Sequence, residues 1–394
     1  GKLTMFKAEL LQEIRDRFHH VNHCPYQGSR VFFENAGGSL TLKSVVEVSA
    51  HFASIPDNQG RDNPASRELV RIINKAREDM MTFFGVSEGV VFTGESGTEL
   101  LFRLVRAAIF GSAEGGNVIG STLEHPATAS ARSQWSPIAG KENISIAHDK
   151  DQAMVTAEHY LEHVTAETRV ATIIQTSPVV GMAVDVKKIA GAIRSKSPDC
   201  FIIVDSIQHA AHGVMDIGAI GVDGCAVSGY KVFSRHNYGV AWVSPRLSTL
   251  RHEKLDGTAD NFWELGTRDT GAFATCSEVV NYLEWLGSQL TGSTDQRTRL
   301  ETAGRAMAEQ EQHLVDVAIN GAEGRTGIRD LPGAFILGGA DNPHREGLVS
   351  YAFTNKPSID VVSELNERGI RTHLRKADYF SGSVLTPLDM DSCI

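Results

Sequence analysis

The sequence lacks apolar stretches long enough to span a membrane, an excess of basic residues, and a cysteine framework. Its 394 residues carry a formal net charge of −10, whereas binding to a nucleic-acid backbone requires a concentrated basic surface. We therefore expect neither a nucleic acid nor a membrane as a partner. The five cysteines are scattered and odd in number, which favours a reducing cytoplasm. Residues 1–7 do not have the pattern of a signal peptide.

A metal site is not expected either. His19, His20, His23 and Cys24 lie close together in the sequence, but no second set of ligands accompanies them. We interpret this cluster as the polar end of a surface helix.

The length and the order of the predicted elements indicate two domains. Apolar residues make up 41% of the chain and charged residues 22%, as in ordinary globular proteins. Strand and helix patterns alternate between residues 90 and 204, which predicts a mostly parallel α/β sheet. A long polar helical region, 277–319, is followed by a short strand, 348–353, and a helix, 358–368. We expect a large domain at 31–278, a smaller α+β domain at 279–394, and an N-terminal segment, 1–30, that packs with the small domain.

Two apolar runs in the predicted large domain deliver a carboxylate and an amine. Residues 201–204 lead into Asp205, and a second run ends at Ser228, Tyr230 and Lys231. Buried parallel strands present polar groups at their carboxyl ends in this way. A lysine and an aspartate held together suit pyridoxal phosphate (PLP), because the amine bonds to its aldehyde and the acid keeps its ring nitrogen protonated. A lysine on the solvated rim of the sheet is the alternative.

A glycine-rich turn, 93–99, falls between a predicted strand and a predicted helix. Its small residues and the helix start favour an anion such as phosphate, although such turns serve sheet packing equally often. The spacing matches neither a Walker A loop nor a dinucleotide-binding fingerprint. His125 follows another predicted strand, where an imidazole could stack on a flat cofactor and move protons. Taken by itself, His125 is interpreted as a loop histidine with a satisfied hydrogen bond.

Together these residues resemble the class V aminotransferase family of fold-type I PLP enzymes, most closely its cysteine desulfurase-like branch. The resemblance implies a large domain with a seven-stranded type of sheet between helices, and PLP as cofactor. It implies that Lys231 binds PLP covalently, His125 stacks on the ring, and Asp205 and Gln208 contact the ring nitrogen and the ring hydroxyl. It also implies a homodimer, because the family's equivalent of Thr267 reaches the phosphate of the other subunit. The remaining phosphate contacts implied are Gly97, Thr98, Ser228 and Tyr230, where tyrosine replaces the family's histidine.

The sequence departs from that family in the segment that follows the last predicted helix. Desulfurases carry a cysteine on a mobile loop there, whereas residues 369–380 contain none, so a persulfide relay through this loop is not expected. The family also binds the substrate carboxylate with an arginine from this region, and both Arg371 and Arg375 are candidates. Pro178 stands where many relatives have asparagine, which shifts substrate binding toward Asn35 and Arg375.

The predicted function is that of a PLP-dependent enzyme acting on a small α-amino acid through a carbanion at Cα. Lys231, His125 and Asp205 are the expected catalytic residues. Cleavage at the β-carbon, as by a C–S lyase or a desulfurase-like enzyme, fits best. The alternatives are a β-decarboxylase or decarboxylative aldolase, an amino-acid epimerase, an aminotransferase, and a non-catalytic binding protein with the PLP fold.

Overall fold

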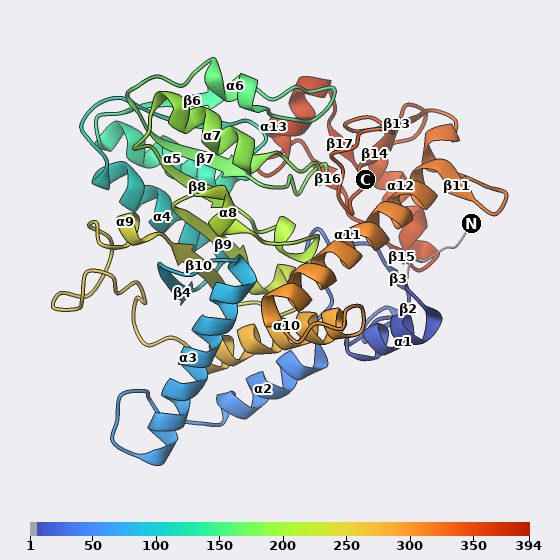
Figure 1. The fold of residues 1–394 in the computed structure, drawn as a ribbon. Helices are drawn as coiled ribbons and strands as arrows, with labels where there is room; N and C mark the ends of the chain where they lie inside the picture. Colours follow the sequence, from blue (N-terminus) through green and yellow to red (C-terminus); the bar gives the residue numbers. More distant parts are fainter. Residues whose placement is uncertain (1–5) are drawn as a thin grey trace.

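A seven-stranded sheet lies at the centre of the computed structural model, which describes residues 6–394 (Figure 1). Residues 1–5, part of the segment expected not to be a signal peptide, lie outside the described residues. The five strands from β9 to β6 are parallel, and β10 alone runs antiparallel to both of its neighbours. The predicted fold class is confirmed. The strand order is β4 (Val90–Gly94), β10 (Gly239–Val243), β9 (Gly224–Ser228), β8 (Phe201–Asp205), β7 (Thr168–Ile174), β5 (Asn117–Ser121) and β6 (Glu142–Ile146).

Helices cover both faces of the sheet, which is why its strands are apolar without alternation. On β8, Ile203 belongs to one apolar cluster, and Ile202 and Val204 belong to the other. Helices α4 (Gly97–Gly111) and α5 (Pro126–Ile138) pack on the first face. The opposite face is covered by α7 (Val186–Lys196) and α8 (Ile217–Ile220), among others. Two short helices, α6 (Ala157–Leu161) and α9 (Pro245–Ser248), lie in connections.

The predicted helical region 277–319 is two helices, α10 (Thr270–Ser288) and α11 (Gln296–Asn320). Asp295 caps α11 by accepting a hydrogen bond from the Thr298 N–H at 2.9 Å, and this cap separates the two helices. Helix α10 begins earlier than predicted because it is buried against α2 (Lys43–Ala53) and α3 (Pro64–Phe84). The boundary expected between residues 278 and 279 therefore falls inside α10, and the division into domains stays a prediction.

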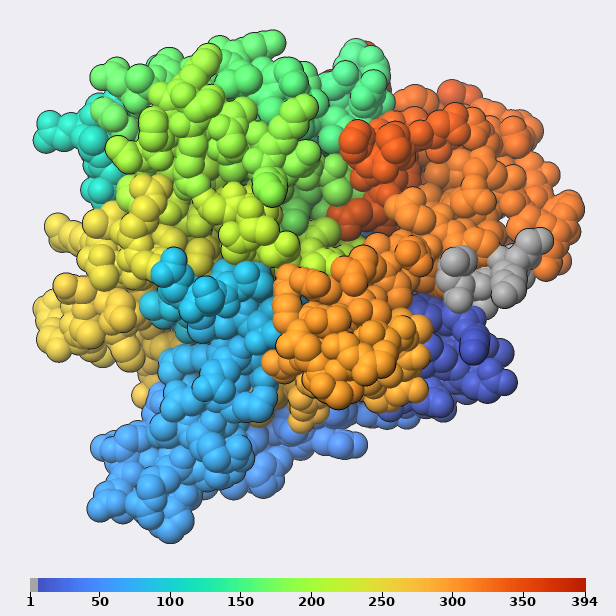
Figure 2. Space-filling model, in the orientation of Figure 1, coloured from blue at the N-terminus to red at the C-terminus, as the bar shows by residue number. Residues whose placement is uncertain are grey.

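The N-terminal and C-terminal parts of the chain meet on one side of the molecule, as Figures 1 and 2 show. Strand β3 (Val31–Phe32) pairs in parallel with β15 (Ile370–Arg371). Of the predicted strand at 348–353, only β14 (Tyr351–Phe353) is formed, and it pairs with β13 (Ala334–Ile336). The other elements are α1 (Ala8–Asp16), β1 (His23–Cys24), β2 (Gly28–Ser29), β11 (Gly321–Ala322), β12 (Arg325–Thr326), α12 (Ser358–Glu367), β16 (Arg375–Lys376), α13 (Gly382–Leu385) and β17 (Ser392–Cys393), with short 3-10 turns η1 (His209–Ala211), η2 (Gly229–Lys231), η3 (Ile328–Asp330) and η4 (Thr386–Leu388).

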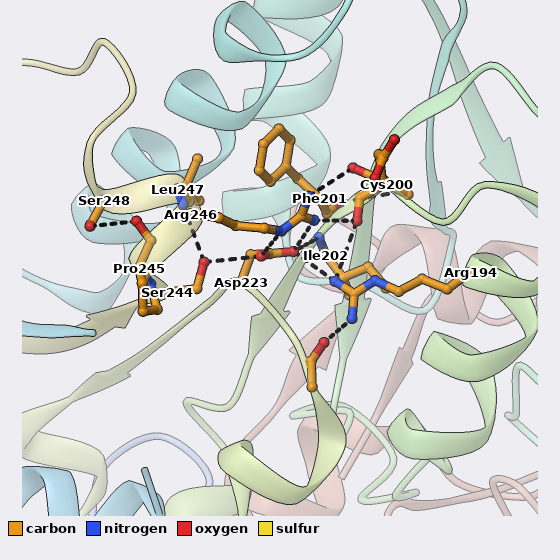
Figure 3. Close-up of polar contacts among 12 residues, drawn as sticks. Arg194, Cys200, Phe201, Ile202, Asp223, Ser244, Pro245, Arg246, Leu247 and Ser248 are labelled. Carbon is orange, nitrogen blue, oxygen red and sulfur yellow. Dashed lines mark hydrogen bonds and ion pairs between the residues drawn. The ribbon is translucent and has the colours of Figure 1, made fainter. Parts of the chain in front are cut away.

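A buried carboxylate joins three strands at the sheet edge opposite the strands' polar carboxyl ends. Asp223 accepts hydrogen bonds from Arg194 at 2.8 Å and from Arg246 at 2.7 and 2.9 Å (Figure 3). It also accepts from the Ile202 N–H and the Ser244 hydroxyl, both at 3.0 Å. Two guanidinium groups thus compensate the buried charge. Among residues 6–394, no helix is long and apolar enough to cross a bilayer.

Candidate active site

Seven of the sequence-predicted residues line one cavity at the carboxyl ends of the parallel strands. Asp205 ends β8 and Ser228 ends β9, while His125 and Thr98 follow β5 and β4. The carboxyl edge is where ligands bind in open α/β sheets. The residues that line the cavity are Thr98, His125, Ile174, Thr176, Pro178, Asp205, Ile207, Gln208, Ser228, Tyr230 and Lys231.

Asp205 is a buried carboxylate without a bonded cation. Its side chain is only 2% exposed, and Oδ1 accepts a hydrogen bond from the Ile207 N–H at 3.0 Å. Burial raises the pKa of Asp205 to about 6, and the attraction of Lys231 opposes that shift only weakly. The carboxylate therefore needs a positive partner from outside the protein, which a protonated ring nitrogen would provide.

Lys231 ends the short turn η2, and its amine donates a hydrogen bond to the Ala36 carbonyl oxygen. Burial, followed by repulsion from Arg375, lowers the pKa of Lys231 to about 8. The turn is held in place from the N-terminal segment, because the Ser39 N–H donates to the Tyr230 carbonyl oxygen at 2.9 Å. A substantial neutral fraction of this amine exists near pH 8, as a nucleophile or a base requires.

His125 caps α5, and this cap fixes its proton. Its Nδ1 accepts a hydrogen bond from the Ala127 N–H at 3.1 Å, so the ring proton lies on Nε2. Burial, with added repulsion from Lys231 and Arg375, lowers the pKa of His125 to about 4. The ring is thus neutral near pH 7 and offers an N–H donor. This state suits stacking and hydrogen bonding better than the proton shuttling considered from the sequence.

The glycine-rich turn packs closely against β9 and the segment after Asp205 at the first turn of α4. The Gly97 N–H donates to the Ser228 hydroxyl at 3.1 Å. A Cβ on Gly97 would lie 2.5 Å from that hydroxyl oxygen and 2.6 Å from Ile207 Cδ1, so only glycine fits. Thr98 lines the cavity beside this turn, where the helix dipole favours negative charge. Tyr230 is fixed nearby by its ring, which stacks on His236 at 4.4 Å.

The cavity fits PLP on observations independent of any resemblance. Gln208 is 6% exposed, and its Oε1 is buried without a hydrogen-bond partner among the described residues. Asp205 lacks a bonded cation among residues 6–394, and the first turn of α4, whose dipole favours an anion, borders the cavity at Thr98. The Gln208 oxygen would accept a hydrogen bond from the ring hydroxyl of PLP, Asp205 would hold the ring nitrogen, the first turn of α4 the phosphate, and the amine of Lys231 the aldehyde.

The structure treats the two candidate arginines differently. Arg371 donates to the Glu34 carboxylate at 3.0 Å, so its charge is already paired. Arg375 donates to the Pro178 carbonyl oxygen at 2.8 Å and to the Ser381 hydroxyl at 3.2 Å, both uncharged acceptors. Its charge also acts on Lys231 and on His125. Arg375 is therefore the arginine that remains available for a substrate carboxylate.

Five predicted site residues do not line the cavity: Gly97, Arg371 and Arg375, described above, and Asn35 and Thr267. Asn35 is exposed in a turn, next to Ala36, whose carbonyl oxygen faces Lys231. Thr267 is exposed and lines a separate surface hollow, formed also by residues 55–59. Sequence reasoning missed Thr176 and two histidines, the partly buried His209 and the buried His212, which contact carboxylates from distant parts of the chain. No local pattern announced these pairs.

The chain belongs to the class V aminotransferase family, whose model matches residues 31–374. It is 24% identical to the cysteine desulfurase-like protein ustD of Aspergillus flavus, over 88% of this chain and 77% of that protein. It is 28% identical to a probable cysteine desulfurase of Mycoplasma genitalium, over 57% of this chain and about half (55%) of that protein. The family uses PLP, so this protein is a PLP-dependent enzyme.

Solved structures show the same fold. The apo structure of a cysteine desulfurase from Thermococcus onnurineus NA1 covers 97% of this chain and matches over 91% of its own, with a TM-score of 0.78. Sequence identity in that comparison is 18%. At this sequence identity the likeness shows the fold and not the reaction.

The Asp205→Asn variant should separate stability from cofactor binding. Because the folded pKa of about 6 exceeds the unfolded value of about 3.9, the carboxyl group favours folding at low pH. This contribution is lost as pH rises through 6. Without PLP, the variant should be more stable than wild type at pH 8, by about 3 kcal/mol, and similar at pH 4. With PLP it should gain less stability than wild type does, because the ring nitrogen loses its carboxylate.

Thermal unfolding with and without PLP at both pH values measures this, and the exposed Asp199→Asn serves as control. A PLP-free variant that is less stable than wild type at pH 8 would contradict the assignment.

Proposed function

We propose that the protein cleaves a bond at the β-carbon of an α-amino acid, releasing a sulfur group as a C–S lyase does. The observation that carries this proposal is that the amine of Lys231, with a pKa of about 8, lines the same cavity as the buried Asp205 and as His125. Residues 369–380 contain no cysteine, which supports direct release of sulfur over transfer to this segment. The cysteine desulfurase-like relatives support the same class of bond cleavage.

Bound PLP would withdraw electrons from the substrate's Cα. Asp205 would keep a proton on the ring nitrogen, because its carboxylate is otherwise buried without a cation. The Nζ atom of Lys231 would take the proton from Cα, for which a pKa near the working pH is favourable. His125 would stack on the ring and donate a hydrogen bond from Nε2 to the departing group.

Arg375 would bind the substrate carboxylate. The carbonyl oxygen of Pro178 and the hydroxyl of Ser381 orient the guanidinium without neutralising it. Asn35 would contribute from the turn next to Ala36. The phosphate contacts proposed within this chain are Gly97, Thr98, Ser228 and Tyr230, with Gln208 facing the ring oxygen.

The proposal includes a homodimer in the cytoplasm. Thr267 cannot serve the cavity of its own chain, since it lines a separate surface hollow with Arg268 and residues 55–59. A second copy that places this loop over the phosphate would complete the site. All five cysteines, which lie in the described part of the chain, have free thiols, in keeping with a reducing compartment.

Substitution of the two arginines should separate their roles. Arg375→Gln should raise KM for the amino acid about 10- to 100-fold, with a smaller change in kcat, because a charge-assisted bond to the carboxylate is lost. Arg371→Gln should change KM less than about threefold, since this arginine already pairs with Glu34. Steady-state kinetics of both variants, at equal PLP content, test this. An equal increase of KM in the two variants would contradict the assignment of Arg375 to the substrate carboxylate.

Product analysis in heavy water tests the reaction itself. With cysteine as substrate, we expect pyruvate, ammonia and sulfide, identified by mass spectrometry and sulfide detection. Deuterium at Cα with an intact side chain would indicate an epimerase instead. Loss of CO2 from aspartate would indicate a β-decarboxylase, and a 2-oxo acid with its side chain intact would indicate an aminotransferase. Absence of any product with all amino acids, despite bound PLP, would indicate a binding protein.

A further inference from the structure

Two partly buried histidine–carboxylate pairs join the segment after Asp205 to the C-terminal part of the chain. Nδ1 of His212 lies 2.8 and 2.9 Å from the carboxylate oxygens of Glu311, on α11. Nδ1 of His209 lies 2.9 and 3.1 Å from those of Glu346. The two pairs differ on the other side of the ring: Nε2 of His209 bonds the Val214 carbonyl oxygen at 2.9 Å. The His209 pair borders the cavity through Thr176, whose hydroxyl donates to Glu346, whereas the His212 pair reaches it through Gln208.

A hydrogen bond between His212 and Gln208 links the His212–Glu311 pair to the cavity. Nε2 of His212 lies 2.9 Å from Nε2 of Gln208, and both side chains are buried. In this arrangement His212 carries its proton on Nδ1, toward Glu311, and accepts at Nε2 from the Gln208 amide. The Gln208 oxygen then faces the cavity, where it is buried without a partner among the described residues.

We propose that Glu311 and His212 are positioning residues that select which end of the Gln208 amide faces the ring oxygen of the cofactor. This inference rests on the proposed use of PLP. When His212 is neutral, the amide oxygen faces the cavity. When His212 is protonated, its Nε2–H can only donate, so the amide must turn its oxygen to the imidazole and its NH2 group to the cavity. An anionic ring oxygen favours the second orientation, because it accepts hydrogen bonds and repels a carbonyl oxygen.

Cofactor binding and protonation of His212 are therefore linked. The groups that act on His212 are Glu311 and Glu346, which favour the imidazolium, and His209, which opposes it. Burial alone lowers the pKa of His212, but the bond to Glu311 outweighs this effect and the net pKa is raised. The imidazolium is present below that raised pKa and lost above it. Removing the charge of Glu311 lowers the pKa and holds Gln208 in the orientation that suits the ring oxygen less.

The test is a titration of PLP-free protein with PLP in Glu311→Gln, His212→Gln and the double variant. We expect each single change to raise the Kd about tenfold. The pH midpoint of the visible absorption change of bound PLP should move upward by about one unit, because the ring oxygen loses a donor that favours its anion. The double variant should shift no further than either single one, since both act through the same amide.

Two matched controls distinguish the relay from loss of charge or of packing. Glu309→Gln removes an exposed charge from the same helix and should match wild type. Glu346→Gln breaks the other pair and should lower the thermal midpoint of unfolding, but it should move the absorption midpoint less than Glu311→Gln does, because Glu346 acts on His212 without a hydrogen bond to it. The proposal is wrong if Glu311→Gln and His212→Gln keep the wild-type Kd and midpoint, or if Glu346→Gln shifts them equally. Wild type that binds no PLP would instead refute the proposed function.

Discussion

The site depends on one unfavourable burial, that of the Asp205 carboxylate. Placing it at the end of a strand covered on both faces removes its hydration and raises its pKa to about 6. The opposite sheet edge shows the contrast, since Asp223 is also buried but bonds two guanidinium groups (Figure 3). Among residues 6–394, no guanidinium or ammonium group bonds Asp205. A positively charged cofactor ring would compensate the carboxylate. The unfavourable free energy of burying this carboxylate in the cofactor-free protein therefore strengthens binding of the cofactor.

Burial raises the pKa of Asp205 but lowers the pKa of Lys231. Loss of hydration and the field of Arg375 lower the pKa of its amine. The pKa of the acid is raised and the pKa of the amine is lowered, so the two values approach each other. This is the arrangement expected where protons are exchanged near neutral pH. The hydrogen bonds of Arg375 go to a carbonyl and a hydroxyl oxygen, so they do not neutralise its charge. Arg371, in contrast, is paired with the Glu34 carboxylate. One cation therefore serves both to tune the amine and to attract a carboxylate.

The sequence predicted the centre of the site better than its surroundings. Asp205 and Lys231 each follow an apolar run, and parallel strands bring such ends together whatever the intervening loops do. The antiparallel direction of β10 and the break between α10 and α11 had no comparable signal, because both depend on packing. The choice between Arg371 and Arg375 depended on Glu34, more than 300 residues away. The pairing of His212 with Glu311 was likewise invisible, since histidine–carboxylate partners at long range follow no period.

Covalent capture of the cofactor is the most direct test of this account. The protein is incubated with PLP, the bond between cofactor and lysine is made permanent with borohydride, and the digested peptides are analysed by mass spectrometry. The account predicts one modified peptide, carrying the cofactor on Lys231, and none in Lys231→Ala. A cofactor attached to another lysine, or to none under saturating PLP, would contradict it.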